Sequence, residues 1–468
     1  MAKSKLKKNQ SGRMLKGSGL LFAVATPTFI VGLSAISLKP TAAQGGPNPK
    51  LVQLGRALFF DEGLSNPAGM ACATCHNPTA GFSYPVSMIN EATGTVPGAV
   101  ESRFGNRKPP TISYARFIPQ GPPTFDPRQQ AYVGGLFFDG RAANLPGQAQ
   151  APLQNPNEMN NLVHNVGSPA LVVSEVESGP NANLFKQVFG PEAFSQPADQ
   201  VFQQIVQAIA AWESSPEVSP FSSKYDAYVA GKATLTAAEL DGLRLFTGTV
   251  NGRPGGQPYV KNAECSSCHV LAPQAGQGPD LFTDSHYYNI GIPRNENNPY
   301  YAQTNKVTDP VGYNALGDDY VDLGLADFLY PDGGLVEGDS LGIKGTFKAP
   351  TLRNVDARPD AEFVKDYGHN GVFKSLASIV HFYNTRNLTR APGEVIDFTK
   401  PNPYEGLKGK PFWPRPEYAS PETLINPAGH ATGPGRHLGN LGLTAKQEAD
   451  IVAFLQTLTD APPPPPAP

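Results

Sequence analysis

The chain carries Cys-Ala-Thr-Cys-His at residues 72–76 and Cys-Ser-Ser-Cys-His at residues 265–269, and these two pentapeptides hold all 4 of its cysteines. In such a pentapeptide the two thiols form thioethers to the vinyl groups of a haem, and the adjacent His binds the iron. A disulfide or a zinc site would not require a His after each second Cys. We therefore predict two covalently bound c-type haems. The predicted attachment and proximal residues are Cys72, Cys75, His76, Cys265, Cys268 and His269.

The residue on the other face of each iron decides whether a haem only transfers electrons or also does chemistry. Around the first haem the chain has no His between His76 and His164, and the nearby methionines are Met70 and Met88. Met70 lies just before an attachment cysteine, which is awkward geometry for a ligand. We therefore expect an open first haem, with Met70 or Met88 as the alternative ligand.

The second haem cannot take a methionine from its own half of the chain, because none of the 5 methionines follows Met159. Residues 375–384 are predicted to form a helix, and Tyr383 lies on its apolar face while His381 is turned away from that face. We predict Tyr383 as the second ligand of this iron, with an ordinary core tyrosine as the alternative. The other candidate ligands are His286, His369, His381, His430 and His437.

Helical patterns dominate the chain, and strand-like alternation is scarce. One amphipathic helix precedes each haem pentapeptide, at residues 49–60 and 236–246, and further helices are predicted at 199–212 and 444–458. The 48 glycines and 48 prolines indicate long, loop-rich connections. The predicted fold is mostly α, with two cytochrome-c-like haem domains and long Pro/Gly-rich loops.

The N-terminus resembles an export signal: a basic stretch is followed by an apolar run from Gly19 to Leu38 and then by small residues. The alternative is an uncleaved membrane anchor, since the run is long enough to cross a bilayer. Either reading places the remaining chain outside the cytoplasm, so we predict a periplasmic protein. The predicted parts are an export signal at 1–43, an N-terminal haem domain at 47–231, a C-terminal haem domain at 232–460 and a Pro-rich tail at 461–468.

Three further stretches resemble the bacterial di-haem cytochrome c peroxidases and their relatives of the MauG type. They are LGRALFFDEGLS at residues 54–65, FFDGRAANLPGQAQAPLQNPNEM at 137–159 and KAPTLRNV at 348–355. The resemblance extends over roughly residues 50 to 460, which is nearly the whole chain after the export signal. It implies an oxidoreductase whose N-terminal haem is the peroxidatic one and whose C-terminal haem transfers electrons.

The resemblance also implies catalytic residues. In that family a glutamate of the N-P-x-E-M motif and a glutamine before it line the distal face of the first haem, and these positions are Glu158 and Gln148 here. Pro152 resembles the family's proline that shapes the distal pocket. A carboxylate above the iron can take a proton from the near oxygen of peroxide and return it to the departing oxygen. The alternative for Glu158 is a solvated loop carboxylate.

Several positions depart from the family's pattern. Activated peroxidases carry a His in the loop after the first haem that closes it until the second haem is reduced, and this chain has none there. Tyr383 aligns with the peroxidases' methionine ligand, as in MauG-like members, and a tyrosinate favours ferric and higher iron states. Phe138 replaces a tryptophan between the haems. The resemblance implies a calcium ion as well, although Lys108 stands where the family's calcium site has an Asn.

We expect hydrogen peroxide to react at the N-terminal haem and electrons to enter through the C-terminal haem. The donor is a small cytochrome or copper protein in a peroxidase, or a Trp or Tyr of a partner protein in a MauG-like enzyme. Tyr383 and the missing loop His favour the MauG-like chemistry. A non-catalytic di-haem electron-transfer cytochrome is the alternative. The net charge of −3 gives no indication of a nucleic-acid partner. The sequence leaves the oligomeric state open between a monomer and a homodimer, although the family that it resembles is often dimeric.

Overall fold

The computed structural model describes residues 48–248, 263–271, 279–331, 342–390, 410–411, 413–418 and 438–462. The predicted export signal, His430, His437 and most of the Pro-rich tail lie outside these ranges. The described residues belong to one compact unit. Within the described ranges, no helix is both long enough and apolar enough to span a bilayer.

Helices dominate the described chain, as predicted, and its strands form only two-stranded antiparallel ladders. The α-helices are α1 (Pro49–Phe59), α2 (Cys72–Cys75), α3 (Ser87–Ala92), α4 (Leu145–Gln154), α5 (Pro169–Ser178), α6 (Ala182–Phe189), α7 (Ala198–Glu213), α8 (Lys224–Val229), α9 (Ala237–Thr247), α10 (Leu325–Leu329), α11 (Leu376–Thr385) and α13 (Ala445–Gln456). The 3₁₀ helices are η1 (Glu62–Leu64), η2 (Pro78–Ala80), η3 (Ala115–Phe117), η4 (Ala193–Ser195), η5 (Cys265–Ser267), η6 (Pro299–Ala302) and η7 (Gly317–Asp319). The strand pairs are β1 (Thr124–Asp126) with β2 (Ala131–Val133), β3 (Leu162–Val163) with β4 (Val166–Gly167), β5 (Tyr287–Tyr288) with β6 (Phe347–Lys348), and β7 (Thr389–Arg390) with β8 (Lys410–Pro411).

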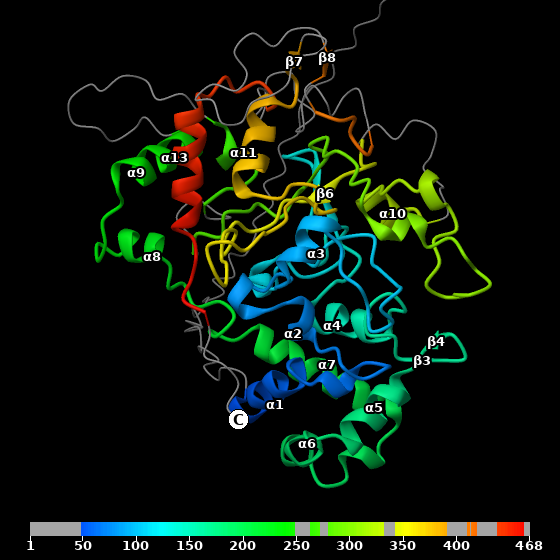
Figure 1. Ribbon diagram of the computed structural model, residues 1–468. Coiled ribbons are helices and arrows are strands. Elements are labelled where there is room, and N and C mark those ends of the chain that lie inside the picture. Colours follow the sequence, from blue (N-terminus) through cyan, green and yellow to red (C-terminus); the bar gives the residue numbers. More distant parts are fainter. Residues whose placement is uncertain are drawn as a thin grey trace, which may run out of the picture. The chain divides into compact units, whose positions relative to one another are not determined.

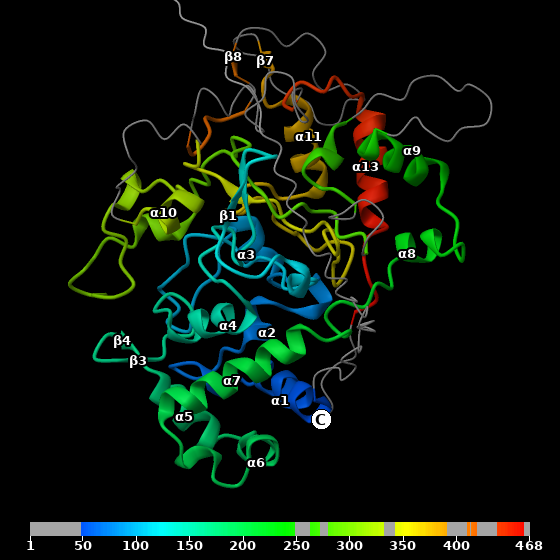
Figure 2. The ribbon, with the colours of Figure 1, turned by 180° about the vertical axis from the view of Figure 1, so that it is seen from behind.

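The first hydrophobic core forms where α1 packs on α7. Gly55 of α1 lies so close to α7 that a Cβ atom there would sit 1.8 Å from the carbonyl oxygen of Ala208. Beside this contact, the rings of Phe59 and the fully buried Trp212 lie 4.4 Å apart. The other face of α7 packs against α4, as both ribbon views show (Figures 1 and 2). The crossing of α1 and α7 therefore supports the segment that follows, which includes the first pentapeptide.

The second hydrophobic core forms where α9 packs on α13. A Cβ atom at Gly242 of α9 would lie 1.9 Å from the carbonyl oxygen of Asp450 of α13. The rings of Phe246 and Phe454 lie 5.3 Å apart at the same crossing. In Figure 1, α9, α11 and α13 gather at the top, whereas α1, α5, α6 and α7 gather at the bottom.

Buried polar contacts join the two halves of the chain. The ammonium group of Lys365 donates to the carbonyl oxygens of Ala80, Asn354 and Ala357, which come from both halves of the chain. The predicted domain boundary near Gly231 falls between α8 and α9. Tyr225 of α8 nevertheless packs in the second core, so α8 belongs with the C-terminal helices in its contacts.

Candidate haem centres

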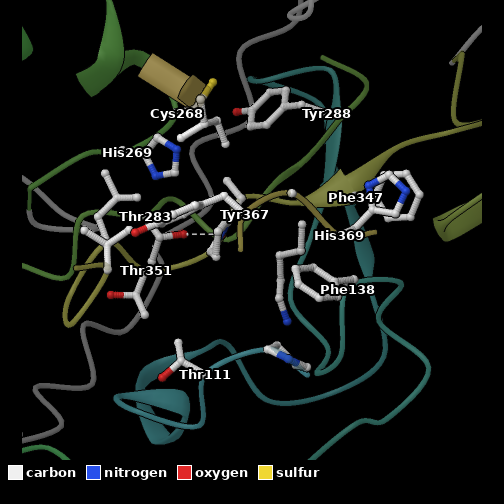
Figure 3. A pocket seen from close by; sticks show the side chains of 18 of the residues that line it. Thr111, Phe138, Cys268, His269, Thr283, Tyr288, Phe347, Thr351, Tyr367 and His369 are labelled. Atoms are coloured by element: carbon white, nitrogen blue, oxygen red, sulfur yellow. Dashed lines mark hydrogen bonds between the residues drawn. The ribbon is translucent and has the colours of Figure 1, made fainter. Parts of the chain in front are cut away.

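One cavity reaches both haem-attachment pentapeptides. His76 lines one part of it, and Cys265, Cys268 and His269 line another. Most of the remaining wall is apolar and comes from loops of both halves. Figure 3 shows His269 and Cys268 together at one side of this cavity, with Thr111 at the opposite side of the view. Because haem is a large apolar group, a continuous apolar space between two attachment sites is what two neighbouring haems require.

The first centre begins at α2. Cys72 and Cys75 lie three residues apart on this short helix, so their thiols project from the same side. His76 follows directly, and its Nδ1 lies 3.3 Å from the carbonyl oxygen of Phe82. Burial lowers the pKa of His76 to about 4, while the carbonyls of Phe82 and Pro110 oppose the shift. The imidazole is therefore neutral, and with Nδ1–H directed at a carbonyl its Nε2 is free for iron.

The second centre repeats this arrangement. Cys265 opens η5 and Cys268 follows it, and the Nδ1 of His269 lies 3.1 Å from the carbonyl oxygen of Phe282. Burial lowers the pKa of His269 as well, and the carbonyls of Phe282 and Pro350 oppose the shift. Each proximal histidine is thus oriented by a phenylalanine carbonyl.

A repeated four-residue segment hydrogen-bonds to the loop beside each histidine. The sequence analysis did not identify this repeat. It reads K-P-P-T up to Thr111 and K-A-P-T up to Thr351. The hydroxyl of Thr111 donates to the carbonyl of Gly81 at 2.9 Å, and the hydroxyl of Thr351 donates to the carbonyl of Leu281 at 2.6 Å. Each acceptor directly precedes the phenylalanine that orients the histidine. The internal repeat K-x-P-T was the sequence signal that could have revealed this brace.

The four cysteines of the two pentapeptides have the same state and similar electrostatics. All four cysteines lie within the described residues, and none forms a disulfide. Burial is the main reason why the pKa of every thiol is raised, to about 12 at Cys75 and Cys265. Protonated, buried thiols are poor partners for thiol–disulfide exchange.

Gln148 and Pro152 lie on α4, and Glu158 lies in the turn that follows. Gln148 lines the cavity. The carbonyl of Pro152 accepts hydrogen bonds from the backbone N–H groups of Asn155 and Met159, at 3.3 and 3.2 Å, and so holds the turn. The side chain of Asn155 donates to Oε1 of Glu158 at 2.9 Å.

The carboxyl of Glu158 lies near the first attachment site but is not among the residues that line the cavity. Burial raises its pKa, while Arg141 and the hydrogen bond from Asn155 oppose the rise. Burial first and then the charge of Glu158 raise the pKa of Cys75, so the carboxyl and the attachment helix are electrostatically coupled. The structure thus brings Gln148 to the cavity wall and Glu158 beside α2.

The two alternative methionine ligands of the first haem do not line the cavity. Met70 is 8% exposed and packs in the first hydrophobic core. Met88 is 71% exposed on α3. Among the described residues, neither methionine therefore reaches the space in front of His76.

Tyr383 lies on the face of α11 that borders the cavity. Burial, and then the charges of Cys268 and Cys265, raise its pKa, while Arg386 opposes the rise. The predicted helix at 375–384 is α11, and Ser375 caps it by accepting a hydrogen bond from the N–H of Ser378. Tyr383 is thus brought together with the attachment cysteines of the second haem.

The described histidines among the candidate ligands have other partners. The Nδ1 of His381 lies 2.9 Å from Glu448 of α13. The ring of His369 stacks on Phe347 with centroids 3.6 Å apart, although His369 also lines the cavity. His286 lies between two aspartates, at 3.5 Å from each. His381 and His286 do not line the cavity.

A family model described as di-haem cytochrome c peroxidase matches residues 49–234. The methylamine utilization protein MauG of Paracoccus denitrificans is 32% identical over 422 residues, which cover 90% of this chain and 91% of that protein. The chain belongs to the di-haem cytochrome c peroxidase and MauG family.

Other members of the family support the assignment. The cytochrome c551 peroxidase of Nitrosomonas europaea is 28% identical over 249 residues, or 51% of this chain and 63% of that protein. The solved structure of the diheme peroxidase BthA from Burkholderia thailandensis is 31% identical, with a TM-score of 0.64 over 89% of this chain and 87% of that chain. The protein is thus a di-haem, peroxidase-like oxidoreductase.

The residues present fit the two c-type haems of this family. Each centre has two free thiols directly before a neutral histidine, and both histidines line one shared apolar cavity; this is the donor set that covalent haem needs. Phe138, at the position of the family's inter-haem tryptophan, lines the same cavity (Figure 3). Its carbonyl accepts a hydrogen bond from the N–H of Lys348 at 2.9 Å.

The residues around Lys108 do not fit a calcium ion. The Nζ atom of Lys108 lies 3.6 Å from Oδ1 of Asp366 and 3.5 Å from the carbonyl oxygen of Pro109. A positively charged ammonium group therefore faces the nearby oxygen atoms at this position, where a calcium ion would need oxygen ligands of its own. In the part of the chain that the structure describes, no group of three or more His, Cys, Asp or Glu side chains could hold a metal ion.

Glu213, at the end of α7, is a further buried group that the sequence analysis did not identify. It is 3% exposed, and its Oε2 has no hydrogen-bond partner among the described residues. Burial raises the pKa of Glu213 to about 8. Its charge is the second cause, after burial, of the raised pKa of Cys72, so it too lies near the first centre.

Proposed function

We propose that the enzyme reacts with hydrogen peroxide at the haem on Cys72 and Cys75 and takes up electrons through the haem on Cys265 and Cys268. One observation carries the proposal: a single cavity is lined by both proximal histidines and by Gln148, while the methionines near the first haem lie elsewhere. An iron at His76 therefore has room on its other face for a small molecule. The N-terminal part, residues 47–231, would be peroxidatic, and residues 232–460 would transfer electrons.

The bound haems supply the redox chemistry. His76 and His269 would hold the irons through Nε2, because their Nδ1 atoms face the carbonyls of Phe82 and Phe282. Tyr383 is the proposed second ligand of the iron at His269, since it lies on the cavity wall with Cys268. A tyrosinate ligand stabilises oxidised iron, which suits a centre that holds an oxidising equivalent until a donor arrives.

The proposed proton chemistry belongs to Glu158. Its carboxylate accepts the proton from the near oxygen of peroxide and returns it to the departing oxygen, so that water leaves. The raised pKa of Glu158 suits a group that must both take and give a proton near neutral pH. The amide of Gln148 orients the peroxide, and Pro152 positions Glu158 by holding the turn that carries it.

The proposed donor is either a small cytochrome or copper protein, or a Trp or Tyr of a partner protein. Tyr383 favours the second, MauG-like alternative, because its ligation works against a high-potential electron input. The relative from Paracoccus denitrificans is named for methylamine utilization, and that role is not carried over to this chain. We also propose the periplasm as the location, on the basis of the basic and apolar N-terminal sequence.

Electron paramagnetic resonance of the haem-loaded ferric protein tests this function. We expect a high-spin signal from an open first haem beside a low-spin signal from the second. In Glu158→Gln the reaction with peroxide should slow by about 10²–10⁴-fold, because the general base is lost. Glu175→Gln is the matched control, since Glu175 is another carboxyl whose pKa is raised by burial but which lies on α5 and is not among the charges that act on Cys72 or Cys75.

Two low-spin signals, together with no reaction between the wild type and peroxide, would contradict the proposal. That result would leave the alternative, a non-catalytic di-haem electron-transfer cytochrome. An equal loss of rate in Glu158→Gln and Glu175→Gln would contradict the specific role of Glu158.

A further inference from the structure

Tyr288 lies at the second haem site and bonds to a carboxylate. It lines the cavity together with Cys268 and His269, and Figure 3 shows it beside Cys268 with its hydroxyl end turned toward that cysteine. The phenol donates a hydrogen bond to Oδ2 of Asp284 at 2.5 Å. Burial, with the charge of Asp284 as a further cause, raises the pKa of Tyr288, so the phenol keeps its proton at rest.

The strand geometry explains why Tyr288, rather than its neighbour, faces this site. In β5, Tyr287 pairs with Lys348 and Tyr288 pairs with Phe347 of β6. Successive side chains of a strand point to opposite faces. The phenol of Tyr287 donates to the backbone carbonyl of Gly134 at 2.7 Å instead. The two adjacent tyrosines therefore differ in their acceptor: Tyr288 bonds to a carboxylate, and Tyr287 bonds to a neutral carbonyl.

A line of ionisable side chains continues from Asp284 toward solvent. Oδ2 of Asp284 lies 3.5 Å from Nδ1 of His286, and Nε2 of His286 lies 3.5 Å from Oδ2 of Asp126. The side chains of Asp284 and His286 are 13% and 10% exposed, whereas that of Asp126 is 30% exposed. A proton received by Asp284 thus has further acceptors between the cavity and the surface.

We propose that Tyr288 is a one-electron relay between the second haem and the electron donor, and that its phenol proton moves to Asp284 in the same step. This inference rests on the proposed function, in which hydrogen peroxide is the oxidant. One electron passes from Tyr288 to the oxidised second haem centre. The phenol O–H bond breaks, and an O–H bond forms on the Asp284 carboxylate, so Tyr288 remains as a neutral radical. An electron from the donor and the returning proton restore the phenol.

Tyr288 can serve as a relay and Tyr287 cannot, because only the phenol of Tyr288 bonds to a carboxylate. Removing an electron from a buried phenol without its proton would leave an unpaired positive charge in an apolar site, which is costly. Asp284 lies at hydrogen-bond distance, so the proton needs no separate path at the moment of transfer. The carbonyl of Gly134, which accepts from Tyr287, cannot take up a proton at neutral pH.

Freeze-quench electron paramagnetic resonance of haem-loaded protein containing ring-deuterated tyrosine tests the relay. After one equivalent of hydrogen peroxide we expect a radical signal that deuteration narrows, which identifies a tyrosyl radical. The signal should vanish in Tyr288→Phe and persist in the control, Tyr287→Phe. In Asp284→Asn, whose amide is not a base, the rate of radical formation should fall by about 10²-fold.

A second arm separates this inference from the proposed function. A flash-oxidised ruthenium complex removes one electron from the protein without peroxide, and the same tyrosyl signal is expected at Tyr288. If the signal forms under the flash but peroxide does not react, the relay stands and the proposed function fails. A radical signal of unchanged size and rate in Tyr288→Phe, or no tyrosyl signal in the wild type in either arm, would overturn the relay.

Discussion

In the N-terminal half, Gly55 of α1 approaches Ala208 of α7, and in the C-terminal half Gly242 of α9 approaches Asp450 of α13 in the same way. A Cβ atom would lie 1.8 Å from the carbonyl oxygen in the first case and 1.9 Å in the second. In both halves the helix before the haem pentapeptide thus crosses the last helix of its core at a glycine. The same close crossing supports each attachment site.

The resemblance of the two halves extends to the proximal loops. Phe82 and Phe282, whose carbonyls face the histidines, both have a positive φ, of 57° and 55°. A positive φ is uncommon for a residue with a large side chain and costs on the order of 1–3 kcal/mol. Their rings lie 6.1 Å from Trp212 and 6.1 Å from Phe454, respectively. The same strained residue, held by the same kind of aromatic contact, therefore orients each histidine.

The two halves differ in the groups placed around this shared frame. The first centre has Gln148 on the cavity wall and Glu158 beside α2, whereas the second has Tyr383 and Tyr288. The repeated lysine differs as well: Lys108 faces Asp366, while Lys348 donates to the carbonyl of Gly135 at 2.5 Å. One kind of scaffold thus carries a carboxyl and an amide at one end and two phenols at the other.

Substitutions at the two helix crossings should cause the largest loss of stability. Gly55→Ala and Gly242→Ala should each lower the free energy of unfolding by about 2–4 kcal/mol, because a methyl group would overlap a backbone carbonyl. Denaturant unfolding of the haem-loaded protein measures this. Gly105→Ala is the control, since a Cβ atom there lies 3.6 Å from its nearest neighbour. If only one of the two glycines is sensitive, the crossings are not equivalent.

We expect the pH dependence of stability to differ between the two halves because of Glu213. Glu213 directly follows Trp212 in the first half, whereas Leu455 follows Phe454 at the corresponding place in the second. The folded-state pKa of Glu213 is about 8, above the ordinary value of 4.5. The neutral carboxyl is therefore favoured by folding. The contribution of the neutral Glu213 carboxyl to the free energy of unfolding is fully present below pH 4.5 and is lost as the pH rises to about 8.

Between pH 5 and pH 8 the free energy of unfolding should fall more steeply in the wild type than in Glu213→Gln, by on the order of 3 kcal/mol. Unfolding measured at both pH values in both proteins checks the prediction. Parallel pH dependences would show that Glu213 does not distinguish the two halves.

Substitutions of Thr111 and Thr351 should cause smaller losses of stability that are similar to each other. Thr111→Val and Thr351→Val each remove a hydroxyl that donates to a carbonyl and accepts from the backbone N–H of Ser113 or Arg353. We expect each substitution to destabilise the protein by about 1–2 kcal/mol. Thermal unfolding of the two variants side by side tests the equivalence, which a loss in only one of them would contradict.

The smallest effect is expected from calcium removal. Because the ammonium group of Lys108 faces Asp366 and Pro109, a chelator should change neither the haem absorption spectrum nor the free energy of unfolding. Elemental analysis of the purified protein should find no stoichiometric calcium. One calcium ion per chain would contradict this reading of Lys108.

The sequence by itself predicted which residues attach the haems, because C-x-x-C-H places two thiols and a histidine within a short stretch of chain. Helical periodicity also placed Tyr383 on the correct face of α11, since neighbours on a helix face are close in sequence. The same local rules predicted the helices that became α1, α7, α9 and α13.

Only the tertiary structure decided how these local pieces are combined. That both pentapeptides border one cavity depends on loops from both halves. That His381 bonds to Glu448, and that Asp126 lies next to His286, depends on contacts between residues far apart in the chain. Such contacts leave no periodic trace in the sequence, because they are set by the packing of whole elements and by the burial of the charged groups between them.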